Sequence, residues 1–195
     1  MRALTVRHFT EADVPLRTAV LREQRFGSNL TDWALVADVE EVQAHQRRLL
    51  ARAQETVRIY CACRGDGEVV GFLWITDVDW RAQTCELSVA MLPRYRVGFG
   101  TLAVIAAQHH LYGELNIRVV VHRVLEHNTM LNSRDRLATT SQVRCDHDSY
   151  TVGEFRTALM WTQTAEDFHA NLDRLPNRRD ELGARIRART EKVSS

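Results

Sequence analysis

The sequence predicts a mixed α/β (α+β) fold, with a central mixed, mostly antiparallel sheet of about six or seven strands, flanking helices and a C-terminal helical tail. Three observations predict it. Segments of alternating apolar residues are interleaved with segments of helical periodicity. Two of the strand-like segments flank Arg64-Gly65-Asp66-Gly67, and Asp-Gly is a favoured tight-turn pair. The 195 residues, 45% of them hydrophobic and 26% charged, suffice for one domain with a substantial core.

The first part of the chain predicts a strand, two helices and a hairpin. The alternating run Leu4–Phe9 is typical of a strand. Thr10 is expected to cap the helix that follows, whose first turn carries Glu11 and Asp13, where negative charge suits the helix dipole. The next expected elements are a helix over about 38–54 and the hairpin strands 57–63 and 69–75.

The second part predicts a strand, a glycine-containing turn and a helix, followed by further strands. A strand over about 84–92 ends at Pro93, and residues 98–111 have helical periodicity. A short strand over Ile117–Val121 is indicated by its β-branched residues. The remaining expected elements are a polar helix over about 127–137 and strands over 142–144 and 154–163, separated by a turn containing Asp146, Asp148 and Gly153.

Charge and hydropathy exclude several classes of protein. The net charge of +1 and pI near 7.8 argue against the broad basic surface of a dedicated nucleic-acid binder. Arg2, Arg7 and His8 interrupt any apolar run that could serve as a signal peptide. No segment has the roughly 20 apolar residues needed to span a bilayer. We therefore expect a cytoplasmic protein with neither a nucleic-acid nor a membrane partner.

The cysteines are expected to be reduced thiols. Cys61 and Cys63 alternate within a predicted strand, so both should point to one face of the sheet. The sequence contains no Cys-x-x-Cys pair, and buried structural thiols are therefore favoured over a metal site. No metal is expected.

The composition changes at Ala165. Residues 165–192 are charged and arginine-rich, with apolar residues spaced for an amphipathic helix that Pro176 interrupts. Acidic residues in this segment nearly cancel its arginines, so packing on the domain or on a partner subunit is favoured over a nucleic-acid arm. A homodimer is compatible with this expectation.

The turn between the strand from about residue 84 and the next helix carries the strongest functional signal. It runs Pro93-Arg94-Tyr95-Arg96-Val97-Gly98-Phe99-Gly100-Thr101. Gly98 and Gly100 let the backbone approach a ligand, and the unpaired N–H groups of a helix N-terminus bind phosphate. Arg94 and Arg96 add positive charge. A dinucleotide-binding motif needs a third glycine, which is missing here.

This turn resembles the acyl-coenzyme A pyrophosphate loop of GNAT superfamily N-acyltransferases, whose usual form is Arg/Gln-x-x-Gly-x-Gly/Ala. The order of strands and helices is similar too. Within the superfamily, LTVRHFTEADV (4–14) and EHNTMLNSRDRL (126–137) look most like the branch of ribosomal-protein and antibiotic N-acetyltransferases. The resemblance covers about residues 3–163. It departs where Tyr95 replaces Arg or Gln, and near Leu137, where the family's frequent general-acid tyrosine is absent.

The resemblance implies a GNAT acyl-CoA-binding domain over residues 1–164, a charged amphipathic helical extension over 165–195, and acetyl-CoA as co-substrate. In the family, backbone amides of the fourth strand contact the pantetheine and the acyl carbonyl. Asn128 matches an asparagine that often lies near the coenzyme, although a helix N-cap explains it almost equally well. The implied coenzyme-binding residues are Val89, Met91, Leu92, Arg94, Arg96, Val97, Gly98, Phe99, Gly100, Thr101 and Asn128.

The resemblance also implies catalytic roles. Glu86 is the candidate general base, because family members often carry a carboxylate on this strand; the alternative is a structural pair with an arginine. Ser133 and Tyr150 are candidate acids for the departing thiolate, although a coenzyme thiol is acidic enough to leave without one. Three tryptophans either line an acceptor pocket or pack in the core: Trp33, Trp74 and Trp80.

The expected function is therefore an N-acetyltransferase that moves an acetyl group from acetyl-CoA to a primary amine. The acceptor is a small molecule, antibiotic-like or biosynthetic, or a protein N-terminus. Two alternatives remain open. One is a non-catalytic GNAT-fold module that binds acyl-CoA and acts as a regulatory or interaction partner. The other is a transferase that takes an acyl or aminoacyl group from a carrier-bound donor.

Overall fold

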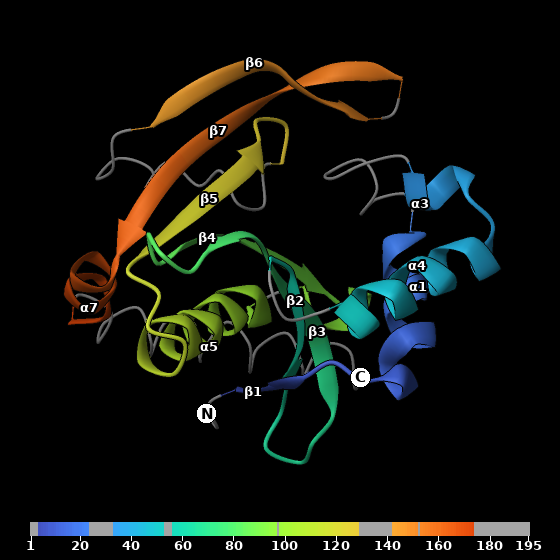
Figure 1. Cartoon of the computed structure of the whole chain (residues 1–195), viewed down its shortest axis with the longest axis horizontal. Coiled ribbons are helices and arrows are strands. Elements are labelled where there is room, and N and C mark those ends of the chain that lie inside the picture. Colours follow the sequence, from blue (N-terminus) through green and yellow to red (C-terminus); the bar gives the residue numbers. More distant parts are fainter. Residues whose placement is uncertain are drawn as a thin grey trace, which may run out of the picture.

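The centre of the molecule is one seven-stranded sheet with the strand order β1-β2-β3-β4-β5-β7-β6 (Figure 1). The computed structural model describes residues 4–23, 33–52, 56–96, 98–128, 142–151 and 153–173. β4 and β5 are parallel, and the other neighbouring strands are antiparallel, which confirms the predicted mixed, mostly antiparallel sheet. The strands are β1 (Thr5–His8), β2 (Arg58–Cys63), β3 (Val69–Asp79), β4 (Thr84–Met91), β5 (Val119–Leu125), β6 (Val143–Thr151) and β7 (Glu154–Thr164).

The described helices lie on both sides of this sheet (Figure 1). Three of them gather near one end: α1 (Val14–Leu21), the short α3 (Trp33–Val36) and α4 (Val39–Arg52). The sequence did not predict α3. On the other side lies α5 (Phe99–Gly113), and α7 (Ala165–Asp173) lies beyond it. None of the described helices is long and apolar enough to cross a membrane.

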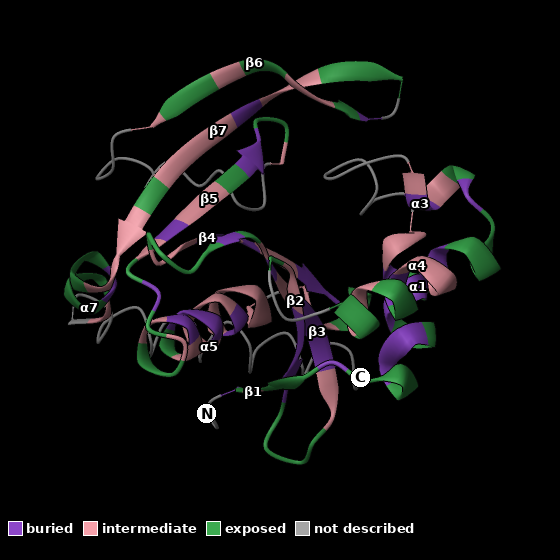
Figure 2. Cartoon of the chain, viewed as in Figure 1, coloured by how far each residue is buried: buried purple, intermediate pink, exposed green. Residues whose placement is uncertain are grey.

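The strands separate two hydrophobic cores. Cys85 and Leu87 of β4 pack with α5 residues such as Ala103 and Leu111. Further along β4, Ala90 belongs to the second core, which includes Val14 of α1. That second core also contains Cys61 and Cys63 together, as the alternation in β2 predicted. Figure 2 shows the resulting burial, with β2 and β3 largely buried and β6 mostly exposed or intermediate.

The first helix begins differently from the sequence prediction. A 3₁₀ turn over Glu11–Asp13 precedes α1. Thr10 is the N-cap, and the Asp13 carboxylate accepts hydrogen bonds from the Thr10 amide and hydroxyl at 2.9 and 2.8 Å. Arg7 donates two further hydrogen bonds to Asp13. The Asp13 carboxylate therefore ties the end of β1 to the start of the helical segment.

The last hairpin corrects a second prediction. β6 extends over Val143–Thr151, so Asp146 and Asp148 lie within the strand rather than in a turn. Gly153, with φ of +77°, lies in the turn as expected. The reason is that β6 is the edge strand of the sheet and needs no alternating apolar face. The predicted helix over 127–137 lies largely outside the described residues.

The start of the C-terminal segment packs on the domain. Phe168 of α7 is 2% exposed, and its ring contacts His109 and Tyr112 of α5. The Asp167 carboxylate accepts hydrogen bonds from the Thr164 amide and hydroxyl, each at 3.0 Å, where β7 passes into α7. Residues 174–195 lie outside the described residues.

Candidate functional site

The pairing between β4 and β5 is short, and the two strands then diverge. The paired residues are Thr84 with Val119, Cys85 with Val120, and Glu86 with Val121. β4 continues to Met91 along β3, while β5 continues to Leu125 along β7. Figure 1 shows the two strands separating beyond this point. The edge of β4 that faces β5 therefore has no β5 partner over residues 87–91.

The backbone of β4 divides its hydrogen-bonding groups between its two edges. Leu92 donates its N–H to the Val70 carbonyl oxygen at 3.0 Å, so its amide faces the β3 side and is engaged. Because amides alternate along a strand, those of Val89 and Met91 point to the opposite edge. Of the three amides predicted to contact a coenzyme, Val89 and Met91 thus face the diverging side, and Leu92 does not.

α5 begins beside the end of β4. Gly98 is its N-cap, with φ of +89°, a conformation that favours glycine, and the helix starts at Phe99. Gly98 has no side chain with which to cap this N-terminus, and the N–H groups of a helix's first turn, here at Gly100 and Thr101, are donors suited to an anionic ligand. Phe99 packs against the core and contacts the ring of Tyr95. Val97 lies outside the described residues.

The two arginines of the turn each pair with a carboxylate of this chain. Arg94 is exposed and pairs with Glu68, which also pairs with Arg64. Arg96 forms a two-pronged pair with Glu23, and its Nε donates to the Met91 carbonyl oxygen at 3.3 Å. Arg96 therefore ties the turn to the end of β4. A phosphate bound by either guanidinium would compete with these carboxylates.

A charged cluster lies where β4 and β5 begin to diverge. The Glu86 carboxylate lies 3.4 Å from Nε of Arg123 on β5. The Nη1 atom of the same arginine lies 3.4 Å from the Asp148 carboxylate of β6. The Glu86 and Asp148 side chains are largely buried, with exposed fractions of 18% and 11%, while Arg123 between them is 38% exposed. Three strands thus bring one cation between two carboxylates.

The environment of Glu86 suits a proton acceptor. Burial raises the pKa of its carboxyl above the ordinary value of 4.5, and the negative charges of Asp77 and Asp148 raise it further. The positive charge of Arg123 opposes this rise. A carboxylate with a raised pKa is a stronger base than an ordinary surface glutamate, and such shifts are typical of functional sites.

Irregularities in two strands bring the acidic residues toward this cluster. β6 has a register shift between Cys145 and Ser149, and His147 within it has φ of +53°. β3 has a register shift between Thr76 and Asp79 that contains Asp77, with φ of +50°. Bulges re-aim side chains and occur next to active sites. Here they lie beside the two acids that influence Glu86.

Of the other two predicted catalytic residues, the structure describes Tyr150, which is not brought into this cluster. Tyr150 is 55% exposed, and its ring packs edge-on against Phe155 at the far end of the last hairpin. Ser133 lies outside the described residues. Asn128 follows β5, and its amide donates to the Leu125 carbonyl oxygen at 2.9 Å.

The three tryptophans contact different partners. Trp74 lies under the guanidinium of Arg17, 4.9 Å from the ring centroid. Arg58 lies over Trp80 at 4.5 Å, and the ring of Trp33 meets that of His45. Trp74 lies on the same face of the sheet as Glu86, because it pairs with Ser88, two residues from Glu86 along β4.

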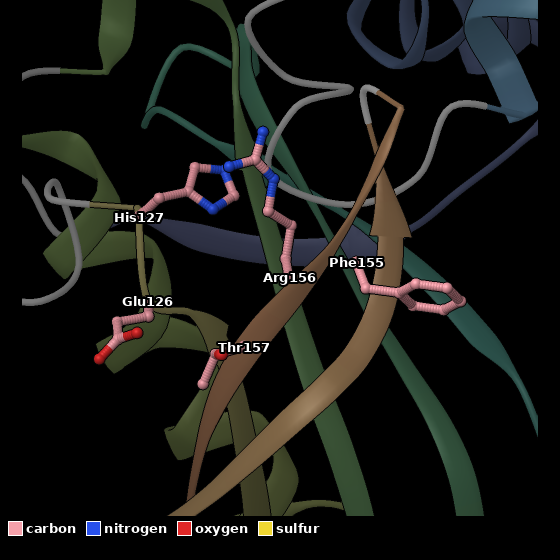
Figure 3. A pocket seen from close by; sticks show the side chains of 5 residues that line it. All are labelled: Glu126, His127, Phe155, Arg156 and Thr157. Atoms are coloured by element: carbon pink, nitrogen blue, oxygen red, sulfur yellow. The ribbon is translucent and has the colours of Figure 1, made fainter.

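A polar cavity of about 210 Å³ lies beyond the end of β5. In Figure 3 the side chains of His127 and Arg156 point toward each other, and Phe155 points away from them. Arg156 also pairs with Glu154, and Glu126 pairs with Arg144. Two of the charged residues that line this cavity, Glu126 and Arg156, are therefore already paired. Its lining residues are Glu126, His127, Phe155, Arg156 and Thr157.

Sequence reasoning missed Arg123 and Asp148. One signal was available for Arg123, which is a charged residue inside the apolar run Val119–Leu125. Asp148 gave no such signal, because it stands in a polar segment that was interpreted as a turn. Its place beside Arg123 depends on the pairing of β6 with β7 and of β7 with β5.

Comparison with known proteins indicates an acetyltransferase domain. Residues 3–133 match the model of the acetyltransferase (GNAT) domain family. No significantly similar sequence was found among the curated proteins.

Solved structures with a similar fold include two acetyltransferases. Spermidine N-acetyltransferase from Vibrio cholerae, in complex with CoA and spermine, has a TM-score of 0.75 at 11% identity over 85% of this chain and 98% of that chain. RimL, a ribosomal L7/L12 α-N-protein acetyltransferase in complex with coenzyme A, has a TM-score of 0.70 at 19% identity. That match covers 85% of this chain and 96% of RimL.

Proposed function

Because this chain belongs to the GNAT acetyltransferase domain family, we propose that it transfers an acetyl group from acetyl-CoA to a primary amine. The observation that carries the proposal is the position of Glu86. It is the last β4 residue paired with β5, so a partly buried carboxylate stands where the two strands diverge. An amine entering there would meet both a base and the unpaired edge of β4.

The donor would bind along that edge. The N–H groups of Val89 and Met91 point away from β3 and are suited to hydrogen-bond the pantetheine arm and the thioester carbonyl. The backbone N–H groups at the N-terminus of α5, which begins after Gly98, are suited to hydrogen-bond the pyrophosphate. Amides aimed at the developing oxyanion typically contribute about 3–4 kcal/mol to lowering the barrier.

Glu86 would accept the proton that an ammonium must lose before its nitrogen can attack. Its raised pKa favours this role, directly or through one water molecule. The neutral amine then attacks the thioester carbonyl and forms the carbon–nitrogen bond. The carbon–sulfur bond breaks, the coenzyme leaves as a thiolate, and the nitrogen gives up its second proton to solvent or to that thiolate, which leaves the amide. No described side chain needs to protonate that thiolate, because a coenzyme thiol is acidic enough to leave without an acid. The acceptor is a small-molecule amine or a protein N-terminus.

Calorimetric titration with acetyl-CoA, free coenzyme A and adenosine diphosphate tests the donor site. We expect micromolar binding of acetyl-CoA by the wild-type chain. Gly98→Glu places negative charge at the N-terminus of α5 and should abolish it. Gly153→Glu is the matched control, because Gly153 also has positive φ but lies in the turn between β6 and β7. Wild-type affinity in the Gly98 variant would contradict the assigned donor site.

Turnover on a panel of primary amines tests the transfer itself. We expect Glu86→Gln to keep its affinity for acetyl-CoA while kcat falls by a factor of about 100 and loses its acidic limb. Wild-type kcat and pH dependence in this variant would exclude Glu86 as the base. Binding of acetyl-CoA without acetylation of any amine would favour a non-catalytic module.

A further inference from the structure

The geometry points to Arg123 as a positioning residue: Asp148 holds its guanidinium, and the guanidinium in turn holds the Glu86 carboxylate where β4 and β5 diverge. This inference rests on the proposed function, since it assigns Arg123 a role toward the candidate base. The two contacts, Asp148 with Arg123 and Arg123 with Glu86, form what we call the relay, and they do not depend on that function. Neither Arg123 nor Asp148 needs to touch a substrate to fulfil this role.

The cross-strand arrangement supports this assignment. Arg123 lies on β5 two residues beyond Val121, the partner of Glu86, so its side chain is on the same face of the sheet as that of Glu86. Its own partner on β7 is the uncharged Met160. Nε of Arg123 faces Glu86, and Nη1 faces Asp148, each at 3.4 Å. A guanidinium is planar and fork-shaped, so restraining one arm restrains the direction of the other. Asp148, which is 11% exposed, therefore limits where Arg123 can place Glu86.

The position of Asp148 is itself built into the fold. The register shift in β6 between Cys145 and Ser149 precedes the regular pairing of Ser149 with Arg156. The Ser149 hydroxyl donates a hydrogen bond to the second Asp148 oxygen at 2.7 Å. One Asp148 oxygen is thus oriented by Ser149 while the other faces Arg123.

The charges around Glu86 come from each strand near it. Asp77 lies on β3, Arg123 on β5 and Asp148 on β6. Arg123 favours the ionised form of Glu86, and the two aspartates disfavour it. Removing Arg123 should therefore make Glu86 easier to protonate. Removing the charge of Asp148 has two opposite effects, because that charge itself raises the pKa of Glu86, while its contact with Arg123 holds in place the charge that lowers it. Only the second effect needs Arg123, so comparing Asp148→Asn with and without Arg123 isolates the relay.

The test follows the carboxyl carbon of Glu86 by NMR in the whole ¹³C-labelled chain, with the signal assigned by its absence in Glu86→Gln. In Arg123→Met we expect the midpoint of its titration to rise by about one pH unit. In Arg123→Lys, which keeps the charge, the midpoint should stay near the wild-type value. Adding Asp148→Asn to Arg123→Met should lower the midpoint, because only the direct charge effect of Asp148 is lost there; Asp148→Asn alone should give a smaller fall or a rise, because the released Arg123 no longer holds Glu86. Arg156→Met is the matched control, because Arg156 also lies on this sheet but pairs with Glu154; it should leave the midpoint unchanged.

An unchanged midpoint in Arg123→Met, or an equal rise in Arg156→Met, would overturn the inference. An equal fall on adding Asp148→Asn to the wild-type chain and to Arg123→Met would remove Asp148 from the relay. If Arg123→Met does not fold, Arg123→Gln takes its place in both comparisons. Once an acceptor is known, the acidic limb of the plot of kcat against pH should shift in each variant by as much as the NMR midpoint does. The KM for acetyl-CoA should stay constant. If no amine is acetylated, the proposed function fails, but the titration still tests the relay.

Discussion

The ring of Phe168 on α7 meets the ring of His109 on α5 edge-on, with centroids 4.9 Å apart and an interplanar angle of 84°. Tyr112 of the same helix lies 5.5 Å from Phe168, measured between ring centroids. The Phe168 side chain is almost completely buried, while most of its neighbours on α7 are exposed. A single aromatic side chain therefore fastens α7 to the domain.

Replacing Phe168 with alanine should lower the free energy of unfolding by about 3–5 kcal/mol, because it empties a buried aromatic site. Urea unfolding followed by circular dichroism measures the change. Phe155→Ala is the matched control, because Phe155 is 59% exposed and should change stability by less than about 1 kcal/mol. Equal effects of the two substitutions would show that Phe168 does not anchor α7.

Gly71 in β3 should tolerate no side chain. A Cβ atom there would lie 2.6 Å from the Ala90 carbonyl oxygen and 2.7 Å from Sδ of Met91, both on β4. We expect Gly71→Ala to lower the melting temperature by several degrees, corresponding to about 1–3 kcal/mol. Gly113→Ala, at the end of α5 where a Cβ would meet nothing within 4 Å, should be neutral or stabilising. A stable Gly71→Ala variant would contradict the close approach of these strands.

Asp13 should make the protein sensitive to acid. The hydrogen bonds from Arg7, and then those from Thr10, hold the pKa of its carboxyl well below the ordinary value of 3.8. The stabilisation is therefore present above about pH 4 and lost as the pH falls toward the pKa of the folded state. Asp13→Asn should lower the free energy of unfolding at pH 7 by about 2 kcal/mol and weaken its fall below pH 4.

The control for Asp13 is Glu11→Gln. Glu11 pairs with Arg47, but its side chain is 63% exposed, so this change should cost less than about 1 kcal/mol. An acid-unfolding curve for Asp13→Asn that parallels the wild-type curve would rule out this role for Asp13.

His122 should make the free energy of unfolding depend on pH in a higher range than Asp13 does. Burial lowers the pKa of its imidazole to about 4, although a hydrogen bond to Gln163 opposes the shift. Since the unfolded chain takes up a proton near pH 6.5, stability is complete above that pH and falls as the pH drops toward 4. The full difference amounts to about 3 kcal/mol. His122→Gln should flatten the plot of unfolding free energy against pH between 4 and 6.5, and a slope equal to that of the wild-type chain would rule out this role for His122.

The parts of the fold with strong local signals were predictable. The β2–β3 hairpin has a tight turn that contains glycine. In the segment from β4 to α5, an apolar strand is followed by Pro93, which ends it, and then by Gly98, which precedes the helix. Their bounds agree with the structure within a few residues. β6 was predicted too short because its polar residues give no alternation; its pairing with β7 makes it a strand.

The candidate site was predictable only in part. Glu86 and the residues near Gly98 lie in one continuous segment, so a resemblance in that segment was enough to indicate them. Arg123 and Asp148 reach Glu86 through pairings between strands that are far apart in the chain. No local pattern specifies such a register. The carboxylates that pair with Arg94 and Arg96 were missed for the same reason.

The divergence of β4 and β5 also divides the chain by sequence. β1 to β4 all precede α5, and β5 to β7 all follow it, so the two antiparallel blocks of the sheet are consecutive halves of one polypeptide. Within the sheet, the two blocks meet only at the parallel pairing of β4 with β5, which spans three residue pairs. A molecule bound along both diverging strands would therefore act as a clasp between the halves, and its binding energy would add to the cohesion of the whole protein.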